Sequence, residues 1–184
     1  MAEYKVLSPD AELLGGMLLT LWSAFPDGFE SIAAQIMEKH GVSNVTPEYW
    51  YRFQHVLNAL REIEQKYGSN ILYQTGARAA EKAPVPLEVD TLKKCLHGLN
   101  VTSSRFHRGG EIGGYEVRES EEYGARKYFV TCSTPYPCSL TRGYLEGFAK
   151  RFGYTAKEVI VRHDESTPCR KQGAESCTYV VSVW

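Results

Sequence analysis

No stretch of the sequence is apolar enough to cross a membrane, because none approaches the roughly 18 residues that a spanning helix requires. The most apolar segment, LLGGMLLTLW, lacks the basic flank and the cleavage site of a signal peptide. A strong charge of one sign is also absent, since the net charge is −1 and acidic and basic residues are balanced along the chain. This balance does not favour a nucleic-acid partner. Together these features predict a cytoplasmic protein without a membrane span.

Cysteines are few and odd in number, five in a chain of 184 residues, which argues against a secreted disulfide scaffold. Common catalytic motifs are missing as well: there is no GxSxG elbow, no P-loop, no GxGxxG after a strand and no HExxH. We therefore predict no catalytic residues. A Cys–His nucleophile pair stays open, because a cysteine at a helix N-terminus is readily activated. The candidates are Cys132 or Cys138 with His107 or His163.

Helix signals fill the first part of the chain, residues 1–108. Ser8 and Thr46 each suit an N-cap, because a proline follows at the first helical position. The helix that starts near Thr46 should end at Gly68. Apolar periodicity predicts further helices over residues 27–41, 70–83 and 87–106.

The second part, residues 109–184, changes to strand signals around one helix. The predicted elements are strands over residues 113–120, 125–133, 157–165 and 177–184, and a helix from Cys138 to Phe152. The order helices-β-β-α-β-β predicts an α+β fold rather than alternating βαβ units. We expect a single domain, residues 1–184, in which the helical half packs on an antiparallel sheet of about four strands.

Three cysteines of the second part are candidates for a metal site. Cys138 opens the predicted helix, where the helix dipole favours the thiolate, and Cys169 and Cys177 flank a glycine-containing turn. Thiolates bind zinc, which takes four ligands in a tetrahedron. The candidates for the fourth ligand are His163, Asp164 and Glu165. The alternatives are buried cysteines that act as small hydrophobes, or a disulfide between Cys132 and Cys138.

The segments that hold these cysteines resemble a known family. PCSLTRGYLEGFAKRFG, EVIVRH and CRKQGAESCTYVV together look like the small-molecule-binding domain that is named for a 4-vinyl reductase. That domain shares its fold with a subunit of the TRAPP vesicle-tethering complex, and it is a sensor module in phenol-responsive bacterial activators. The resemblance covers residues 109–184. It implies a TRAPP-like fold, a structural zinc near a ligand pocket and a homodimer that pairs through its helices.

The resemblance also implies which residues would bind the metal. Sensor members have a cysteine that opens the long helix, then an acid three residues before a second cysteine, and a third cysteine eight residues later. The cysteines of this chain match that pattern, including the eight-residue step from Cys169 to Cys177. Ser166 stands where the acid is expected, and His163 replaces the carboxylate if the strand VIVRH aligns with that of the family. The predicted ligands are Cys138, His163, Cys169 and Cys177.

A second candidate site surrounds His107, in the glycine-rich stretch FHRGGEIGGYEV. His107 could contact a ligand, donate a proton or bind the iron of a tetrapyrrole, and the alternative is a polar turn. The aromatic run EYWYRF suits a pocket for a flat molecule, although Trp50 and Phe53 also have the spacing of core residues. The predicted ligand-binding residues are His107, Trp50, Phe53, Tyr115 and Tyr136.

We expect a small-molecule-binding domain that acts as a sensor or carrier of an apolar or aromatic molecule. We expect no enzymatic activity of its own. If the protein is a sensor, it should pass its signal to a partner protein. Two alternatives stay open. The first is a haem- or tetrapyrrole-binding protein, or an enzyme related to tetrapyrrole vinyl reduction. A haem-binding protein would need His107, His97 or a cysteine at a flat pocket. For the enzyme, no nicotinamide or flavin motif is visible that would supply a hydride. An assembly factor would bind another protein through its helices. Cys95 and Cys132 have no predicted role.

Overall fold

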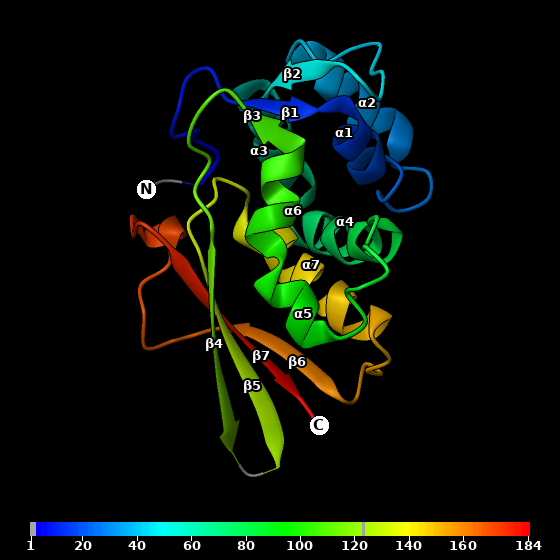
Figure 1. Ribbon diagram of the computed structural model, residues 1–184. Helices are drawn as coiled ribbons and strands as arrows, with labels where there is room; N and C mark the ends of the chain where they lie inside the picture. The colour runs from blue at the N-terminus through cyan, green and yellow to red at the C-terminus, as the bar shows by residue number, and fades with distance from the viewer. Residues whose placement is uncertain (1–2, 123) are drawn as a thin grey trace.

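The computed structural model describes residues 3–122 and 124–184 and has an α+β fold, which confirms the predicted class. The strands are β1 (Glu12–Leu14), β2 (Trp50–Arg52), β3 (His107–Arg108), β4 (Tyr115–Glu122), β5 (Ala125–Cys132), β6 (Val159–His163) and β7 (Cys177–Val183). The helices are α1 (Gly15–Trp22), α2 (Glu30–Lys39), α3 (Phe53–Tyr67), α4 (Ser69–Lys82), α5 (Leu92–His97), α6 (Leu99–Phe106), α7 (Cys138–Arg151) and the short 3₁₀ turn η1 (Arg170–Gln172). Figure 1 shows the long sheet at one end of the molecule and a small sheet beside the N-terminal helices at the other.

The four-stranded sheet has the predicted antiparallel arrangement. Its order is β4-β5-β7-β6, so β4 and β5 form the predicted hairpin, and β6 is joined to β7 by the loop that carries Cys169. The central strand β7 is buried along its whole length. Its pairing with β5 places Cys132 opposite Cys177. The start of β7 is therefore held in a fixed position by neighbours on both sides.

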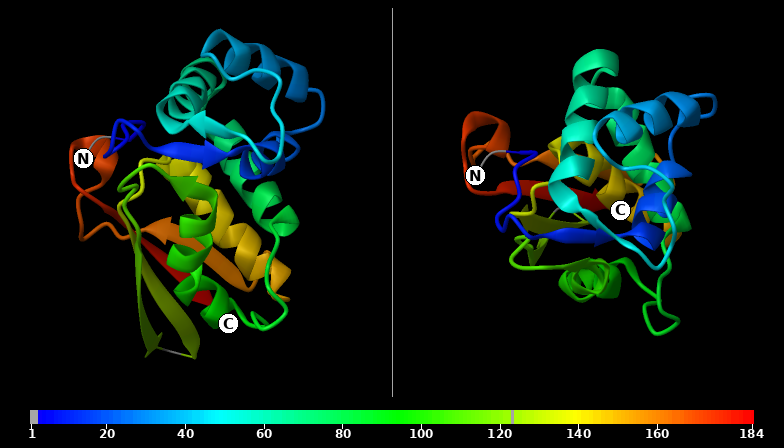
Figure 2. Two further views of the ribbon diagram at one scale, coloured as in Figure 1. Left: turned by 45° about the horizontal axis from the view of Figure 1, so that its top comes forward. Right: turned by 90° about the horizontal axis from the view of Figure 1, so that it is seen from above.

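Helices α4 and α7 lie side by side at close range and join the helical part to the sheet part (Figure 2). A Cβ atom on Gly143 of α7 would lie 2.0 Å from the carbonyl oxygen of Tyr73 in α4. In the same way, a Cβ atom on Gly76 of α4 would lie 2.2 Å from the carbonyl oxygen of Leu140. No side chain fits at those distances, so the crossing requires glycine in both helices.

Two predicted helix starts are wrong, because a second sheet, with the order β2-β1-β3, forms at those positions. Helix α1 therefore begins at Gly15 and α3 at Phe53, several residues later than the capping signals indicate. The Ser8 hydroxyl accepts a hydrogen bond from the backbone N–H of Glu111 at 2.9 Å and does not cap a helix. Local capping signals could not reveal this sheet, because its strands come from three distant segments of the chain.

The other helices agree with the prediction, with one interruption. Helix α3 ends before Gly68, and α2, α4 and α7 fall within a few residues of the expected bounds. The helix predicted over residues 87–106 begins only at Leu92 and is divided at Gly98 into α5 and α6. None of the side chains of α6 is buried. Helix α6 therefore lies on the surface, and it forms one wall of an apolar cavity beneath it.

Two apolar cores lie on the two sides of the α4–α7 crossing. The first packs β1 and the helices α1, α2 and α3 together, and the second fills the space between α5, α7 and the four-stranded sheet. Cys95 and Cys132 belong to the second core and are buried there. They pack as small hydrophobic residues, which is the common role of a buried cysteine.

Candidate metal centre and cavity

Four side chains meet at one end of the four-stranded sheet. The ligand atoms of Cys138, His163, Cys169 and Cys177 all lie within 4.8 Å of one another. The three sulfur atoms form a triangle with sides of 3.2, 3.4 and 3.5 Å. The Nε2 atom of His163 lies 3.9 Å from the sulfur of Cys169. All these cysteines are free, since the sulfur–sulfur distances are far longer than a disulfide bond.

The spacing of the cluster suits a tetrahedral ion. With zinc–sulfur bonds of about 2.3 Å and a zinc–nitrogen bond of about 2.0–2.1 Å, neighbouring ligand atoms of a tetrahedral site lie about 3.6–3.8 Å apart. The sulfur–sulfur distances of 3.2, 3.4 and 3.5 Å are shorter than the tetrahedral value by up to about half an ångström, and the distance of 3.9 Å from the His163 Nε2 atom to the Cys169 sulfur is slightly longer. Small movements of the side chains would therefore admit one ion. Four protein ligands also leave no position for a reactive water. The cluster could therefore hold one metal ion, with the ligand set of a structural site.

Each ligand is placed by a different element. Cys138 is the first residue of α7, His163 the last residue of β6 and Cys177 the first residue of β7. Cys169 precedes η1, and Gly173 closes that turn with a φ of 89°. This left-handed conformation is accessible to glycine without strain. The turn reverses the loop, which brings Cys169 back to the start of β7.

Of the three candidates for the fourth ligand, His163 is the one that lies next to the sulfur atoms. The carboxylate of Asp164 accepts hydrogen bonds from the backbone N–H of Ser166 at 3.0 Å and from its hydroxyl at 2.6 Å. Asp164 is thereby turned toward its own loop. Glu165 is exposed and lines a polar groove that adjoins the cluster. Ser166, which occupies the position of the expected acid, orients Asp164 and is not among the four residues of the cluster.

Hydrogen bonds and burial shift the pKa values of the three cysteine thiols in different directions. The hydrogen bond from Cys138 lowers the pKa of Cys177, and the same bond together with burial raises the pKa of Cys138. Burial also raises the pKa of Cys169. The backbone N–H of Arg170 donates to the sulfur of Cys177 at 3.3 Å, which further favours its thiolate. Cys177 is therefore the first thiolate of the cluster, and a metal ion would displace the protons of the other two cysteines.

Two residues that the sequence analysis missed support the cluster from outside. The carboxylate of Glu3 accepts a hydrogen bond from the backbone N–H of Cys138 at 2.5 Å, at the N-terminus of α7, where the helix dipole favours an anion. The ring of Tyr179 packs against the ring of His163 with 4.6 Å between the centroids. The Tyr179 hydroxyl donates to the carbonyl oxygen of Cys138 at 3.4 Å. Nothing near the cysteines in the sequence points to Glu3, because it lies at the other end of the chain.

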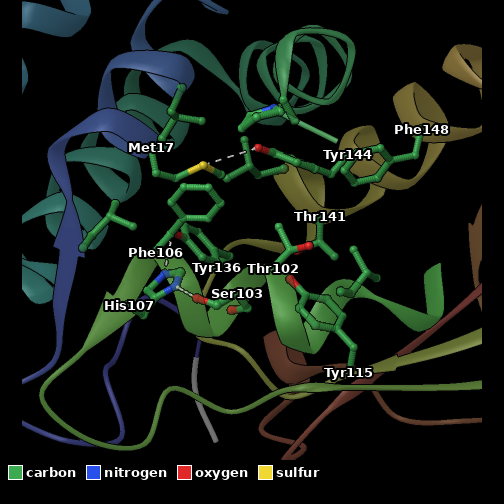
Figure 3. A pocket seen from close by; sticks show the side chains of 16 residues that line it. Met17, Thr102, Ser103, Phe106, His107, Tyr115, Tyr136, Thr141, Tyr144 and Phe148 are labelled. Carbon is green, nitrogen blue, oxygen red and sulfur yellow. Dashed lines mark hydrogen bonds between the residues drawn. The ribbon is translucent and has the colours of Figure 1, made fainter. Parts of the chain in front are cut away.

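A cavity of about 90 Å³ lies between the helical part and the sheet part, under α6 (Figure 3). Its walls come mainly from α1, α6, α7 and the start of β4, and most of the lining side chains are apolar or aromatic. Three of the five predicted ligand-binding residues line it: His107, Tyr115 and Tyr136. Aromatic and thioether residues of the wall that the sequence did not single out are Met17, Phe106, Tyr144 and Phe148.

His107 and Tyr136 form a hydrogen-bonded pair in the cavity wall (Figure 3). The Nδ1–H group of His107 donates to the carbonyl oxygen of Ser103 at 2.8 Å, so Nε2 accepts from the Tyr136 hydroxyl at 3.0 Å. Burial lowers the pKa of His107 and raises the pKa of Tyr136, so both groups are neutral near pH 7. The Tyr136 oxygen can still accept one more hydrogen bond, from a hydroxyl or N–H of a bound molecule.

Phe53 and Trp50, the other two predicted ligand contacts, are not among the residues that line this cavity. Phe53 is fully buried behind the wall, and its ring centroid lies 4.9 Å from the centroids of both His107 and Tyr136. It therefore orients the two wall residues as part of the first core. Trp50 lies on β2, where the guanidinium of Arg108 covers its ring at 4.4 Å from the centroid. The aromatic run pairs as a strand, which turns Trp50 to a different surface.

The remaining histidine and cysteine candidates have other contacts. Both ring nitrogens of His107 are bonded within the fold, so the nucleophile pair of a cysteine with His107 is not formed. His97 lies on the surface, with Nε2 at 2.9 Å from a carboxylate oxygen of Glu119. Burial raises the pKa of Cys95 to about 12. The sulfur of Cys132 lies 3.3 Å from the Thr134 hydroxyl.

Comparison with known proteins does not assign the chain to a family: no protein-family model matches it, and no curated protein matches it either. None of the helices in the described ranges is both long enough and apolar enough to traverse a bilayer. What the structure defines is an α+β domain with two features: a Cys₃His cluster that could hold a metal ion, and an apolar cavity with one neutral polar pair.

Proposed function

We propose that the chain is a small-molecule-binding domain of the 4-vinyl-reductase type, a ligand sensor or carrier with a structural zinc ion. The single observation that carries the proposal is the cavity, because it lies between the two parts of the domain and places a hydrogen-bonding pair in an apolar wall. Ligand sites commonly combine apolar walls with a few polar groups that set the ligand's orientation. The order β4-β5-α7-β6-β7 of the second part and the positions of the three cysteines support the family resemblance.

The ligand that suits the cavity is a small, neutral aromatic molecule. A volume of about 90 Å³ is well below the roughly 300–1,000 Å³ of pockets for drug-sized ligands, so a single ring is the expected size. Aromatic walls favour an aromatic ring. A charged group would lose its hydration without a counter-charge, because His107 and Tyr136 are both neutral. A phenol has the required ring and one hydroxyl to donate to Tyr136.

The metal that suits the cluster is zinc. Three thiolates and one imidazole in a tetrahedral arrangement form a common zinc ligand set. An ion at this position would cross-link α7, β6 and β7, and it would replace the protons that the sulfurs now share. Its expected role is to hold the loop between β6 and β7 against the helix. The resemblance further suggests a cytoplasmic homodimer that pairs through its helices and, for a sensor, a partner protein that receives the signal.

A tetrapyrrole receives less support from the site. Both nitrogens of His107 already form hydrogen bonds, so an iron ligand there would require breaking one of them. The cavity is also too small for a macrocycle without a large movement of α6. His97 contacts Glu119 on the surface and does not line the cavity. We therefore place the small aromatic ligand first.

Calorimetric titration with phenol, and with benzoate as a charged ring of similar size, tests the proposal. We expect phenol to bind and benzoate not to bind. A Thr102→Trp substitution on α6 should fill the cavity and abolish phenol binding. Ser104→Trp, on the exposed side of the same helix, is the matched control and should leave binding unchanged. Phenol binding that survives Thr102→Trp would contradict the cavity as the site, and elemental analysis should find a single zinc ion per chain.

A further inference from the structure

Arg170, the first residue of η1, is a charged side chain that the fold buries almost completely. Only 2% of its surface is exposed, although a guanidinium is positively charged at every physiological pH. Its Nε atom lies 3.5 Å from the sulfur of Cys177, and Nη2 donates to the carbonyl oxygen of Tyr136 at 3.0 Å. Its Nη1 atom has no hydrogen-bond partner within residues 3–122 and 124–184. A buried charge of this kind is very costly unless an opposite charge lies close to it.

The opposite charge does not come from a carboxylate. None of the ion pairs among the described residues includes Arg170. The backbone N–H of Arg170 donates to the sulfur of Cys177 at 3.3 Å, and the Nε atom lies 3.5 Å from the same sulfur. Sulfur is therefore the group that stabilises the guanidinium. The sulfur in hydrogen-bond contact with it is the one from the metal cluster.

The charges of the cluster and of Arg170 match if the ion is divalent. Three thiolates and a neutral imidazole around a divalent cation leave one negative charge on the centre. Arg170 carries one positive charge, so centre and side chain together are neutral. A monovalent ion would leave an excess negative charge in the protein interior, and a trivalent ion would leave Arg170 without a counter-charge. Both alternatives carry a desolvation penalty that the divalent ion avoids.

We propose that Arg170 is the counter-cation of the metal centre and couples the centre to the cavity, so that metal binding and small-molecule binding strengthen each other. One side of the guanidinium faces Cys177, and the other holds the carbonyl oxygen of Tyr136. The Tyr136 side chain lines the cavity and bonds His107. A metal ion would fix the position of the Cys177 sulfur that the guanidinium contacts, and the guanidinium would in turn hold the Tyr136 carbonyl oxygen, and with it Tyr136, in the ligand-binding position. The coupling rests on the proposed function, because it requires a ligand in the cavity.

Metal affinity tests the counter-cation. Zinc affinity is measured by chelator competition for the wild type, Arg170→Met and Arg170→Lys. Arg170→Met keeps much of the volume but removes the charge, so we expect zinc to bind about 10–100-fold more weakly, as for other residues that support metal ligands. Arg170→Lys keeps the charge and should restore most of that loss. Lys171→Met is the matched control, since Lys171 is exposed, pairs with Glu64 and should leave zinc affinity within about twofold.

The same competition in saturating phenol tests the coupling, because linkage between two ligands is reciprocal. Phenol should tighten zinc binding to the wild type and to Lys171→Met by about 5-fold or more, and should have little effect on Arg170→Met. Equal zinc affinity of Arg170→Met and the control would overturn the counter-cation. Phenol that binds without changing zinc affinity would overturn the coupling and leave the proposed function intact. Phenol that binds no form would refute the proposed function and the coupling together, while the affinities without phenol would still decide the role of Arg170.

Discussion

Replacing Tyr136 with phenylalanine removes one oxygen atom and isolates a buried nitrogen. The Tyr136 hydroxyl donates to Nε2 of His107 at 3.0 Å, and His107 is only 9% exposed. Phenylalanine keeps the ring and its packing against Phe53, so the substitution leaves almost no cavity. A buried acceptor that loses its donor costs about 1–3 kcal/mol. The melting temperature should fall by several degrees, since a chain of this length loses about 2–4 °C per kcal/mol.

A second partly buried tyrosine of the same cavity, Tyr144, provides the control for this substitution. The Tyr144 hydroxyl has a weak contact with the sulfur of Met17 at 3.9 Å. Tyr144→Phe should therefore cost less than Tyr136→Phe in the free energy of unfolding, measured by urea titration of both variants. Equal losses would show that removing any buried hydroxyl has this cost, and no loss in Tyr136→Phe would refute the His107–Tyr136 hydrogen bond. Tyr136→Phe should also weaken phenol binding, because the ligand loses its acceptor.

The remaining predictions concern the metal, the pH dependence and the helix crossing. Cys169→Ser should lose most of the bound zinc in elemental analysis, whereas Cys95→Ser, which removes a buried thiol that is not one of the four cluster residues, should retain it. Equal zinc contents would contradict the cluster as the site. Burial lowers the pKa of His107 in the folded chain, so the unfolded chain binds the proton more readily. The stability that neutral His107 contributes is therefore present above about pH 6.5, the pKa of an unperturbed histidine. It is lost as the pH falls through the lower pKa of the folded state. His107→Gln should flatten that slope in unfolding titrations between pH 7 and 5, and an unchanged slope would contradict the buried, neutral His107. Gly143→Ala places a Cβ atom 2.0 Å from the Tyr73 carbonyl oxygen and should destabilise the fold by about 1–3 kcal/mol or more. Gly16→Ala is the control and should be tolerated, because the nearest atom to its Cβ lies at 3.5 Å. A Gly143→Ala chain as stable as the wild type would disprove the close crossing.

Much of the fold could be predicted because its signals are local. The hairpin of β4 and β5, the helix from Cys138 and the two last strands all have periodic apolar residues between clear turn residues. The small sheet could not be predicted in this way. Its strands are two or three residues long, and their hydrogen-bond partners lie far along the chain. Backbone pairing at β1 and β2 overrides the capping signals of Ser8 and Thr46.

The candidate site shows the same division between local and distant information. The three cysteines could be grouped from the sequence, because a helix start, a turn and a strand start are local features that each carry one thiol. The sequence left three candidates for the fourth ligand, because adjacent residues at a strand end can point in different directions. Only the end of β6 and the hydrogen bonds of Asp164 select His163.

Residue types and short periods are sufficient to predict the α+β class, the three cysteines of the Cys₃His cluster and the aromatic character of the candidate ligand site. Three features could be seen only in the folded chain: Phe53 supports the cavity wall from behind, Trp50 faces another surface, and Arg170 is enclosed beside Cys177. These contacts join residues that are far apart in the chain. Their geometry is set by the packing of whole elements, such as the glycine-dependent crossing of α4 and α7, which no single segment encodes.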